Sequence, residues 1–318
     1  MILTKKIVKS VITWLIASLF IIVIILMPRD VTYDTTEAGV FQDAHYVYSF
    51  EKHMQSFKDF FTFIKENKSL GNYNSYYTIE DILVESIPKS FMIVLLALLL
   101  GFIFGLFKGM IDYRLSISSR WTIFGKGSTW FFLSIPDFFI VISLQLGLMF
   151  LYDIGLFPYV DVFGSDKVDN FIMAIIYLMI YPLFYISKVV STCFEAEERK
   201  DYIRTARSKG ISYNKILYLH VLWNCWITIL TNLSTISLYM LSNLFIIEKF
   251  MGYKGAGYYF FSAVTPGAMV YVGGGRDLGL ANMAIAFTLI FTLFILIVHI
   301  ISHISIYILD KKRMGETA

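Results

Sequence analysis

Charged residues are scarce in this chain, because Asp, Glu, Lys and Arg together make up 16% of its 318 residues. Hydrophobic residues make up 57%. Soluble globular chains carry about 25% charged residues, so the composition excludes an ordinary soluble protein and predicts a polytopic membrane protein. The net charge of +3 gives no indication of nucleic acid binding.

Cysteine is scarce as well, since the chain has only Cys193 and Cys225. Both fall near the ends of apolar stretches and provide no disulfide framework, so we interpret them as free thiols.

Catalytic and cofactor motifs are also missing. The chain has no G-x-S-x-G or H-E-x-x-H sequence, and FGKGST at residues 124–129 lacks the spacing of a phosphate-binding loop. His299 and His303 are spaced like two metal ligands, but no Cys or carboxylate accompanies them nearby on that stretch. We therefore predict no enzymatic activity, no metal site and no cofactor bound by this chain itself.

Six stretches are apolar and long enough, at roughly 20 residues, to cross a bilayer as helices. They are Ile7–Met27, Ser90–Phe107, Gly127–Leu151, Phe171–Val190, Leu222–Ile247 and Leu280–Leu309. The fold class predicted is all-α with six transmembrane helices and both termini on one side. The first stretch has no small-residue cleavage site after it, so we interpret it as a retained span.

The orientation follows from the distribution of Lys and Arg between the loops. With the termini in the cytoplasm, the inside segments carry most of the 27 basic residues, seven of them between Lys188 and Lys215. The first outside loop, Pro28–Lys89, has six basic and ten acidic residues. We predict that both termini are cytoplasmic.

Three regions follow from these spans. Residues 1–27 form the N-terminus and first span, residues 28–89 an extracytoplasmic loop, and residues 90–318 a core of five spans with a charged loop at 194–221. The first loop contains apolar residues at helical spacing, which predict an amphipathic helix: Phe50, Met54, Phe57, Phe61 and Ile64. This helix is either a structural cap on the spans or a docking surface for an extracellular delivery protein.

Prolines interrupt two of the apolar stretches. Pro136 and Pro182 each remove a backbone hydrogen bond and are expected to kink the third and fourth spans. Asp137 is the carboxylate that we single out within an apolar run, and such an acid indicates a cavity or a partner. Pro136 and Asp137 either line a translocation path, or Asp137 lies near the water boundary.

The fifth span carries a polar stripe. Asn232, Thr235 and Asn243 belong to it, and most members of the stripe recur at steps of three or four. Lipid penalises such a face, so the stripe either forms hydrogen bonds with other helices or lines a hydrated path.

The charged stretch Phe194–Trp223 contains a glycine near its middle. Acidic residues begin it and basic residues follow, which suits a helix dipole. Gly210 stands where a helix C-cap needs a left-handed residue, and Ser212 is placed to cap a second helix. One side of the first helix carries Ile203, Ala206 and Gly210, which predict a small apolar knob. This knob either fits a groove on a partner protein or belongs to a solvated amphipathic loop that has no partner.

The sequence DYIRTARSKG followed by ISYNKILYLHVLWN resembles the EAA loop of ABC importer permeases, in the form carried by the oligopeptide, dipeptide and nickel class. Four further segments resemble this family in the right order: MPRD at 27–30, LGNYNS with SIPKSFMIVLLALLLGFIFG, SIPDFF, and IIEKFMGYKGAGYYFFSAV. The chain departs from the family at Trp223, where many members have proline, and at Asp137, where most have a small or hydroxylated residue.

The resemblance implies a B-type permease subunit of an importer for oligopeptides or dipeptides, in a bacterial cell membrane. It implies a second permease, two ATPase subunits that bind ATP and Mg, an extracytoplasmic binding protein and surrounding lipid, with no nucleic acid. The loop would couple to the ATPase through Asp201, Tyr202, Ile203, Arg204, Thr205, Ala206, Arg207, Lys209, Gly210 and Ile211. The alternatives are an ion-driven transporter or channel, marked by acidic pairs or inverted repeats, and a membrane-bound enzyme.

Overall fold

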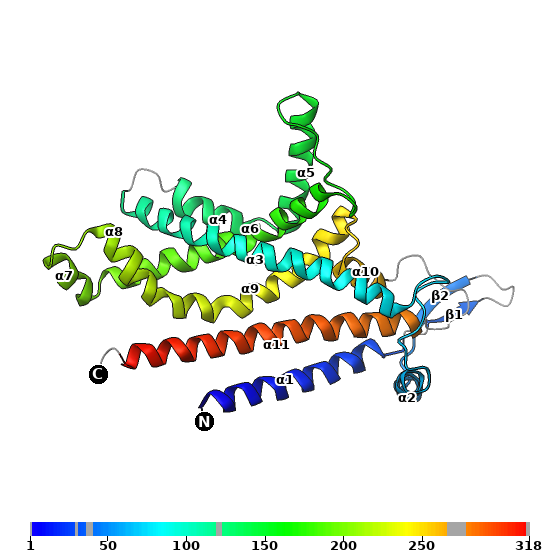
Figure 1. The fold of residues 1–318 in the computed structure, drawn as a ribbon. Coiled ribbons are helices and arrows are strands. Elements are labelled where there is room, and N and C mark those ends of the chain that lie inside the picture. The colour runs from blue at the N-terminus through cyan, green and yellow to red at the C-terminus, as the bar shows by residue number, and fades with distance from the viewer. Residues whose placement is uncertain (1, 29–30, 36–40, 119–122, 266–277, 316–318) are drawn as a thin grey trace.

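The computed structural model describes residues 2–28, 31–35, 41–118, 123–265 and 278–315. Its centre is made of three long helices: α3 (Ile79–Ser118), α6 (Val168–Glu198) and α9 (Leu222–Met251). Two more, α1 (Ile2–Ile25) and α11 (Leu278–Gly315), run side by side along this group (Figure 1). The start of α1 and the end of α11 lie at the same end of the bundle, as an even number of crossings requires.

In the described part of the chain, five helices are long and apolar enough to cross a membrane. The segment Ile123–Ser134 and α5 (Asp137–Asp153) pass the same test of length and apolar composition only when taken together, and they meet at an angle of 106°. The first segment consists of the π-helical turn η1 (Ile123–Gly127) and α4 (Ser128–Ser134). The prediction of an all-α membrane fold is therefore confirmed, and the number of candidate spans reaches the predicted six when this bent pair is counted as one.

The break in the third span is much sharper than the kink expected there. Ile135 and Pro136 both adopt extended backbone angles, with ψ near 135°. A proline lacks the N–H for a helical bond and disfavours helix in the residue before it, so the helix stops and restarts at Asp137. As a result α5 projects sideways from the bundle (Figure 1). Pro182, in contrast, lies inside α6, which continues as a helix on both sides of it.

A row of small residues allows α3 and α6 to pack closely. Gly101, Gly105 and Gly109 lie four residues apart on the side of α3 that faces α6. A Cβ atom added to Gly105 would lie 2.7 Å from the carbonyl oxygen of Leu183, closer than van der Waals contact permits. These glycines therefore form a close-packing face between the two helices.

The first long loop contains the predicted amphipathic helix, α2 (Phe50–Asn67). Its buried residue Phe60 packs with Leu26, which directly follows α1, and with Ile285 of α11, and Phe57 and Ile64 lie beside them. A hairpin of β1 (Val31–Thr35) and β2 (Phe41–Tyr46), which we did not predict, precedes α2. These contacts support a role as a cap on the spans, although three predicted members of the apolar face remain exposed: Phe50, Met54 and Phe61.

A buried carboxylate joins three helices at the end of the bundle away from the chain termini. Glu248 is completely buried near the end of α9. It accepts hydrogen bonds from the Ser90 hydroxyl of α3 at 2.5 Å and from the Tyr258 amide of α10 (Ala256–Val264) at 2.9 Å. The Ser90 hydroxyl in turn accepts the Ala256 amide at 2.7 Å. A carboxylate at a helix N-terminus is favourable, so Glu248 fixes the start of α10.

The interpretation of the two cysteines as free thiols is wrong. Cys193, near the end of α6, and Cys225, near the start of α9, are joined by a disulfide with their Cα atoms 5.9 Å apart. The two helices pack against each other, which brings together residues separated by 32 positions in sequence. The spacing of two isolated cysteines contains no information on this contact.

Candidate functional site

The charged loop lies at the end of the bundle that also holds the start of α1 and the end of α11 (Figure 1). Its first helix, α7 (Asp201–Ser208), ends at Gly210, which has a φ of +74°. The Gly210 amide donates to the Arg207 carbonyl at 3.0 Å and the Ile211 amide to the Ala206 carbonyl at 3.2 Å. This pair of bonds is the Schellman arrangement, so the predicted glycine cap is confirmed.

The second half of the loop does not form a separate short helix. Ser212 occupies the N-cap position of α8 (Tyr213–Lys215), but its side chain makes no capping bond. The helix continues through the π-helical turn η2 (Ile216–Val221) directly into α9. The loop is therefore one short helix followed by an extension of the fifth span, and Trp223 lies inside that continuous helix.

The apolar side of α7 faces the protein's own core. Ile203 is 3% exposed and Ala206 is 9% exposed, and both belong to the main core cluster. The predicted outward knob is therefore wrong, because the bundle itself takes up these side chains. The outer surface of α7 and of the two residues after it is polar, with three basic residues and one acidic residue, and the exposed residues are Asp201, Arg204, Thr205, Arg207, Ser208, Lys209 and Gly210.

Two of the three glutamates in this stretch, Glu197 and Glu198, attach α7 to the bundle, whereas Glu195 pairs with Lys126 of η1. Contrary to the dipole interpretation, all three lie in the last turns of α6 rather than at the start of α7. The most buried, Glu197, accepts hydrogen bonds from the Tyr202 hydroxyl at 2.7 Å and the Asn224 amide at 3.2 Å, and pairs with Lys200. Glu197 therefore connects α6, α7 and α9, a role that the sequence did not indicate.

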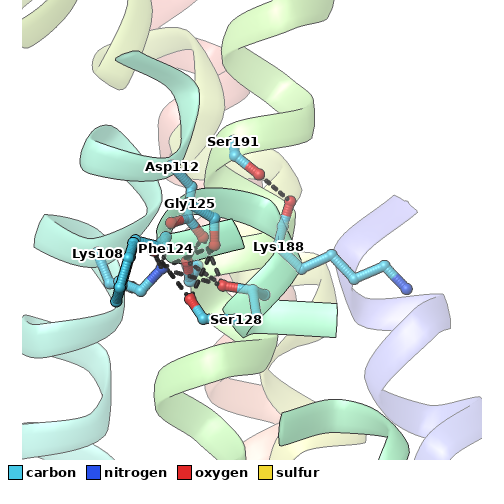
Figure 2. A network of polar contacts seen from close by, with 9 residues as sticks. Lys108, Asp112, Phe124, Gly125, Ser128, Lys188 and Ser191 are labelled. Atoms are coloured by element: carbon cyan, nitrogen blue, oxygen red, sulfur yellow. Dashed lines mark hydrogen bonds and ion pairs between the residues drawn. The ribbon is translucent and has the colours of Figure 1, made fainter. Parts of the chain in front are cut away.

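A second polar network lies where η1 and α4 pack on α3 and α6 (Figure 2). Asp112 of α3 is fully buried, pairs with Lys108 and accepts hydrogen bonds from Thr129 and from Ser187, the latter at 2.7 Å. Lys108 also donates to the carbonyls of Phe124 and Gly125 in η1, at 3.3 and 3.2 Å. The FGKGST segment is therefore held by its carbonyl groups, consistent with a structural role.

The sequence analysis missed Asp112, although a signal was present. Lys108 and Asp112 are four residues apart at the end of an apolar run, a spacing at which opposite charges meet on a helix. Acidic residues that end up buried in a membrane bundle need such partners. Asp112 and Glu248 are both more deeply buried than Asp137, the residue that we singled out.

Asp137 and Asn243 of the predicted path are in contact. The Asn243 side-chain amide donates to Asp137 Oδ2 at 2.7 Å, which joins the start of α5 to α9. Pro136 precedes Asp137 at the break and sets where α5 begins. This pair is one end of a longer polar arrangement.

Tyrosines extend this arrangement to Asn232 of the predicted path. The rings of Tyr181 and Tyr239 stack with centroids 3.6 Å apart, and Tyr181 also stacks on Tyr185 at 5.5 Å. The Tyr185 hydroxyl donates to Asn232 Oδ1 at 3.0 Å. The structure therefore lines up Asp137, Asn243 and Asn232 along α6 and α9, and it adds Tyr181 and Tyr185, which the sequence analysis did not name.

Much of the polar stripe on α9 lies on the exposed side of the helix, away from the other helices of the bundle. Thr235 is exposed, as are Thr228, Thr231, Tyr239 and Ser242. Two of the hydroxyls donate to their own helix, Thr231 to the Ile227 carbonyl at 2.8 Å and Ser242 to the Leu238 carbonyl at 3.2 Å. Both alternatives for this stripe stay open, because either the helices of another subunit or water can reach the exposed side chains.

The two histidines of α11, His299 and His303, contact each other. His299 Nε2 and His303 Nε2 lie 3.0 Å apart, and the Ser234 hydroxyl contacts His299 Nδ1 at 3.1 Å. Among the described residues, no group of three or more His, Cys, Asp or Glu side chains is arranged to hold a metal ion.

Together these features define a helical multi-span membrane protein with a polar, basic helix–glycine loop at one end and a polar face on its fifth span. Residues 97–314 match the family described as "Binding-protein-dependent transport system inner membrane component". The chain belongs to this family, which confirms the resemblance found in the sequence.

Named relatives of this chain are peptide permeases. It is 27% identical over 197 residues to the dipeptide transport system permease protein DppB of Bacillus subtilis, and 28% identical over 184 residues to DppB of Lactococcus lactis subsp. cremoris. These matches span 59% and 57% of this chain and 59% and 58% of the relatives, so the chain matches less than two thirds of their length.

The fold is also found in a solved transporter. The MetNI methionine ABC transporter, in inward-facing conformations, contains a chain that matches with a TM-score of 0.54 at 13% identity. The match covers 72% of this chain and 96% of the other. At this identity the likeness establishes the fold alone.

Proposed function

We propose that this chain is a transmembrane permease subunit of an ATP-driven importer for dipeptides or oligopeptides. The observation that carries the proposal is α7, a short helix that is closed by Gly210, anchored on both α6 and α9, and exposes Arg204 and Thr205. The names of the relatives supply the substrate class. ATP and Mg would be bound by two ATPase subunits, and an extracytoplasmic protein would deliver the peptide.

The anchoring of α7 suggests how a cytoplasmic ATPase moves the spans. Because Glu197 holds Tyr202 of α7 and Asn224 of α9, a displacement of α7 acts on the ends of α6 and α9 together. The two nucleotide states of the ATPase would then favour two arrangements of these helices, since only a difference in binding free energy shifts such an equilibrium. Contact between α7 and a cytoplasmic ATPase requires that α7, and with it both chain termini at the same end of the bundle, lie in the cytoplasm.

A second permease subunit is part of the proposal because α5 has few neighbours within this chain. The helix projects from the bundle and exposes large apolar side chains, including Phe139 at 56%, Leu146 at 61% and Phe150 at 62%. The polar face of α9 is exposed as well. A second permease that covers α5 and faces α9 would complete a path between the two subunits.

Purification of the assembled complex tests this proposal. A tagged chain, expressed with its chromosomal neighbours, is expected to recover ATPase subunits and a second permease. Proteoliposomes that contain this complex should take up dipeptide only when ATP is present on the side of the membrane that carries the ATPase subunits. Dissipating ion gradients with ionophores should leave uptake unchanged. Recovery of a homomer that transports without an ATPase subunit would overturn the proposal.

Asp137 is expected to influence transport through its charge. Asp137→Asn retains a side chain that can bond to Asn243 but removes the carboxylate from the proposed path. We expect uptake of peptides with a free amino terminus to fall roughly tenfold, because loss of one charge-assisted contact costs about 1.5–3 kcal/mol. Uptake by complexes reconstituted in liposomes measures this.

The matched control for this change is Asp153→Asn, which removes an exposed carboxylate from the other end of α5. We expect it to leave uptake unchanged. Equal uptake by the wild type and Asp137→Asn would exclude a role for the Asp137 charge in the path.

A further inference from the structure

A cavity of about 510 Å³, largely open to the outside, lies between α1 and the middle of α11, on the side of the bundle where the His299–His303 pair lies. Its lining includes Lys6, Lys9 and Trp14 from α1, and Thr292, His299 and His303 from α11. The Trp14 indole N–H donates to the Thr292 hydroxyl at 3.2 Å and so joins the two helices across the cavity. Beyond this bond the helices lie closer together, and Ser18 and Leu26 are buried.

The cavity is basic at one end and apolar at the other. Lys6 and Lys9 lie near the start of α1, whereas Ala17 and Leu296 line the part closer to the middle of the helices. At 1.5 Å per residue, Lys6 and Ala17 are separated by about 17 Å along α1. A ligand that fills this space must therefore be an amphiphile, with an anionic end and an apolar end.

The side chains that the structure describes do not neutralise the positive charge of the cavity. Among the side chains that the structure describes, no carboxylate forms an ion pair with Lys6 or Lys9. The two histidines add ring nitrogens at the same end, with His303 Nε2 against His299 Nε2 at 3.0 Å. Ammonium and imidazole groups together form a surface that attracts a phosphate group.

The surroundings of the cavity identify the source of that phosphate. The neighbouring side chains on both helices are apolar and exposed, with Leu15 at 54% and Ile16 at 66% on α1, and Ile297 at 47% and Ile301 at 51% on α11. On a membrane-spanning helix such side chains contact lipid. The molecules with access to the cavity are therefore the lipids around the protein.

We propose that this cavity binds an anionic phospholipid. Its phosphate contacts Lys6, Lys9 and His303, and one acyl chain lies along Trp14, Ala17 and Leu296. Basic pockets between helices at a membrane surface recognise anionic head groups in this way. The bound lipid fills the space between α1 and α11 and neutralises the charge there.

Quenching of tryptophan fluorescence by brominated lipids tests the site. The full chain, with the subunits that copurify with it, is placed in nanodiscs that contain either brominated phosphatidylglycerol or brominated phosphatidylcholine. We expect a preference for phosphatidylglycerol that Trp14→Phe removes, because Trp14 lines the cavity. Lys6→Gln with Lys9→Gln should lower this preference roughly tenfold, since each lysine near a surface contributes to the binding of anionic lipid.

Two matched variants separate charge at the site from overall charge and from folding. Lys58→Gln with Lys65→Gln removes two exposed lysines from α2 and should leave the preference unchanged. Lys6→Arg with Lys9→Arg keeps the charge and should retain the preference. Equal quenching by the two lipids, no quenching of Trp14, or displacement of the brominated lipid by inorganic phosphate at equal concentration would each overturn the proposal.

Discussion

Gly105→Val is expected to prevent the close packing of α3 on α6 and to lower the yield of folded protein sharply. The first added atom would lie 2.7 Å from the Leu183 carbonyl oxygen and 2.9 Å from Ile186 Cβ. A carbonyl within a helix cannot rotate away as a side chain can, so the helices must separate. Overpacking of this kind costs about 1–3 kcal/mol, and separation of the two helices also weakens the contacts around Gly101 and Gly109.

Thermal denaturation of the purified chain, followed by size-exclusion chromatography, measures this effect. We expect the apparent melting temperature to fall by roughly 5 °C or more, since 1 kcal/mol corresponds to about 2–4 °C for a chain of this size. Gly147→Val is the control, because Gly147 also lies within a helix but no atom lies within 4 Å of its added Cβ. Similar melting temperatures for the two variants would show that the close contact at Gly105 is unimportant.

Gly210→Val is expected to abolish coupling between the ATPase and the spans. The position is open, with nothing within 4 Å of an added Cβ, so any effect arises from the backbone. Its φ of +74° is unfavourable for a β-branched residue, and such strain costs about 1–3 kcal/mol. We expect the last turn of α7 to unravel, and peptide uptake and peptide-stimulated ATPase activity to fall by roughly tenfold or more.

The comparison variant at this position is Gly210→Asn. Asparagine tolerates the left-handed conformation, so it should retain most of the uptake although it is larger than glycine. Membrane insertion should be the same for both variants, because Gly210 is exposed and lies in the loop between α7 and α8. If valine and asparagine had equal effects, the backbone conformation of Gly210 would not be what coupling requires.

Local patterns in the sequence predicted a large part of this structure. The five long helices follow from apolar runs, α2 follows from apolar spacing, and the end of α7 follows from Gly210. In each of these cases the determining residues lie within a few positions of one another, so the sequence contains the relevant information.

Features that depend on residues far apart in the chain were not predicted. Ser90 reaches Glu248 across 158 positions, and Asp112 reaches Ser187 across 75. The direction of α7 was mispredicted for the same reason, because a short amphipathic helix can place its apolar side on its own core or on a partner. Only the packing of Ile203 and Ala206 distinguishes these cases. The sharp break at Pro136 was underestimated because it requires two consecutive extended residues.

Because of the 106° break after α4, α5 lies apart from the bundle and its surface is available to another helix. Lipid chains are as apolar as the Phe and Leu side chains on this helix, so covering it with protein gains little from the hydrophobic effect. Neighbours in a bilayer are distinguished instead by how well their surfaces fit. On α5 the small residues Ser143 and Gly147 lie four positions apart between bulky ones. A helix with a matching ridge can approach closely there. The shape of the partner's surface, rather than its hydrophobicity, therefore decides which helix packs on α5.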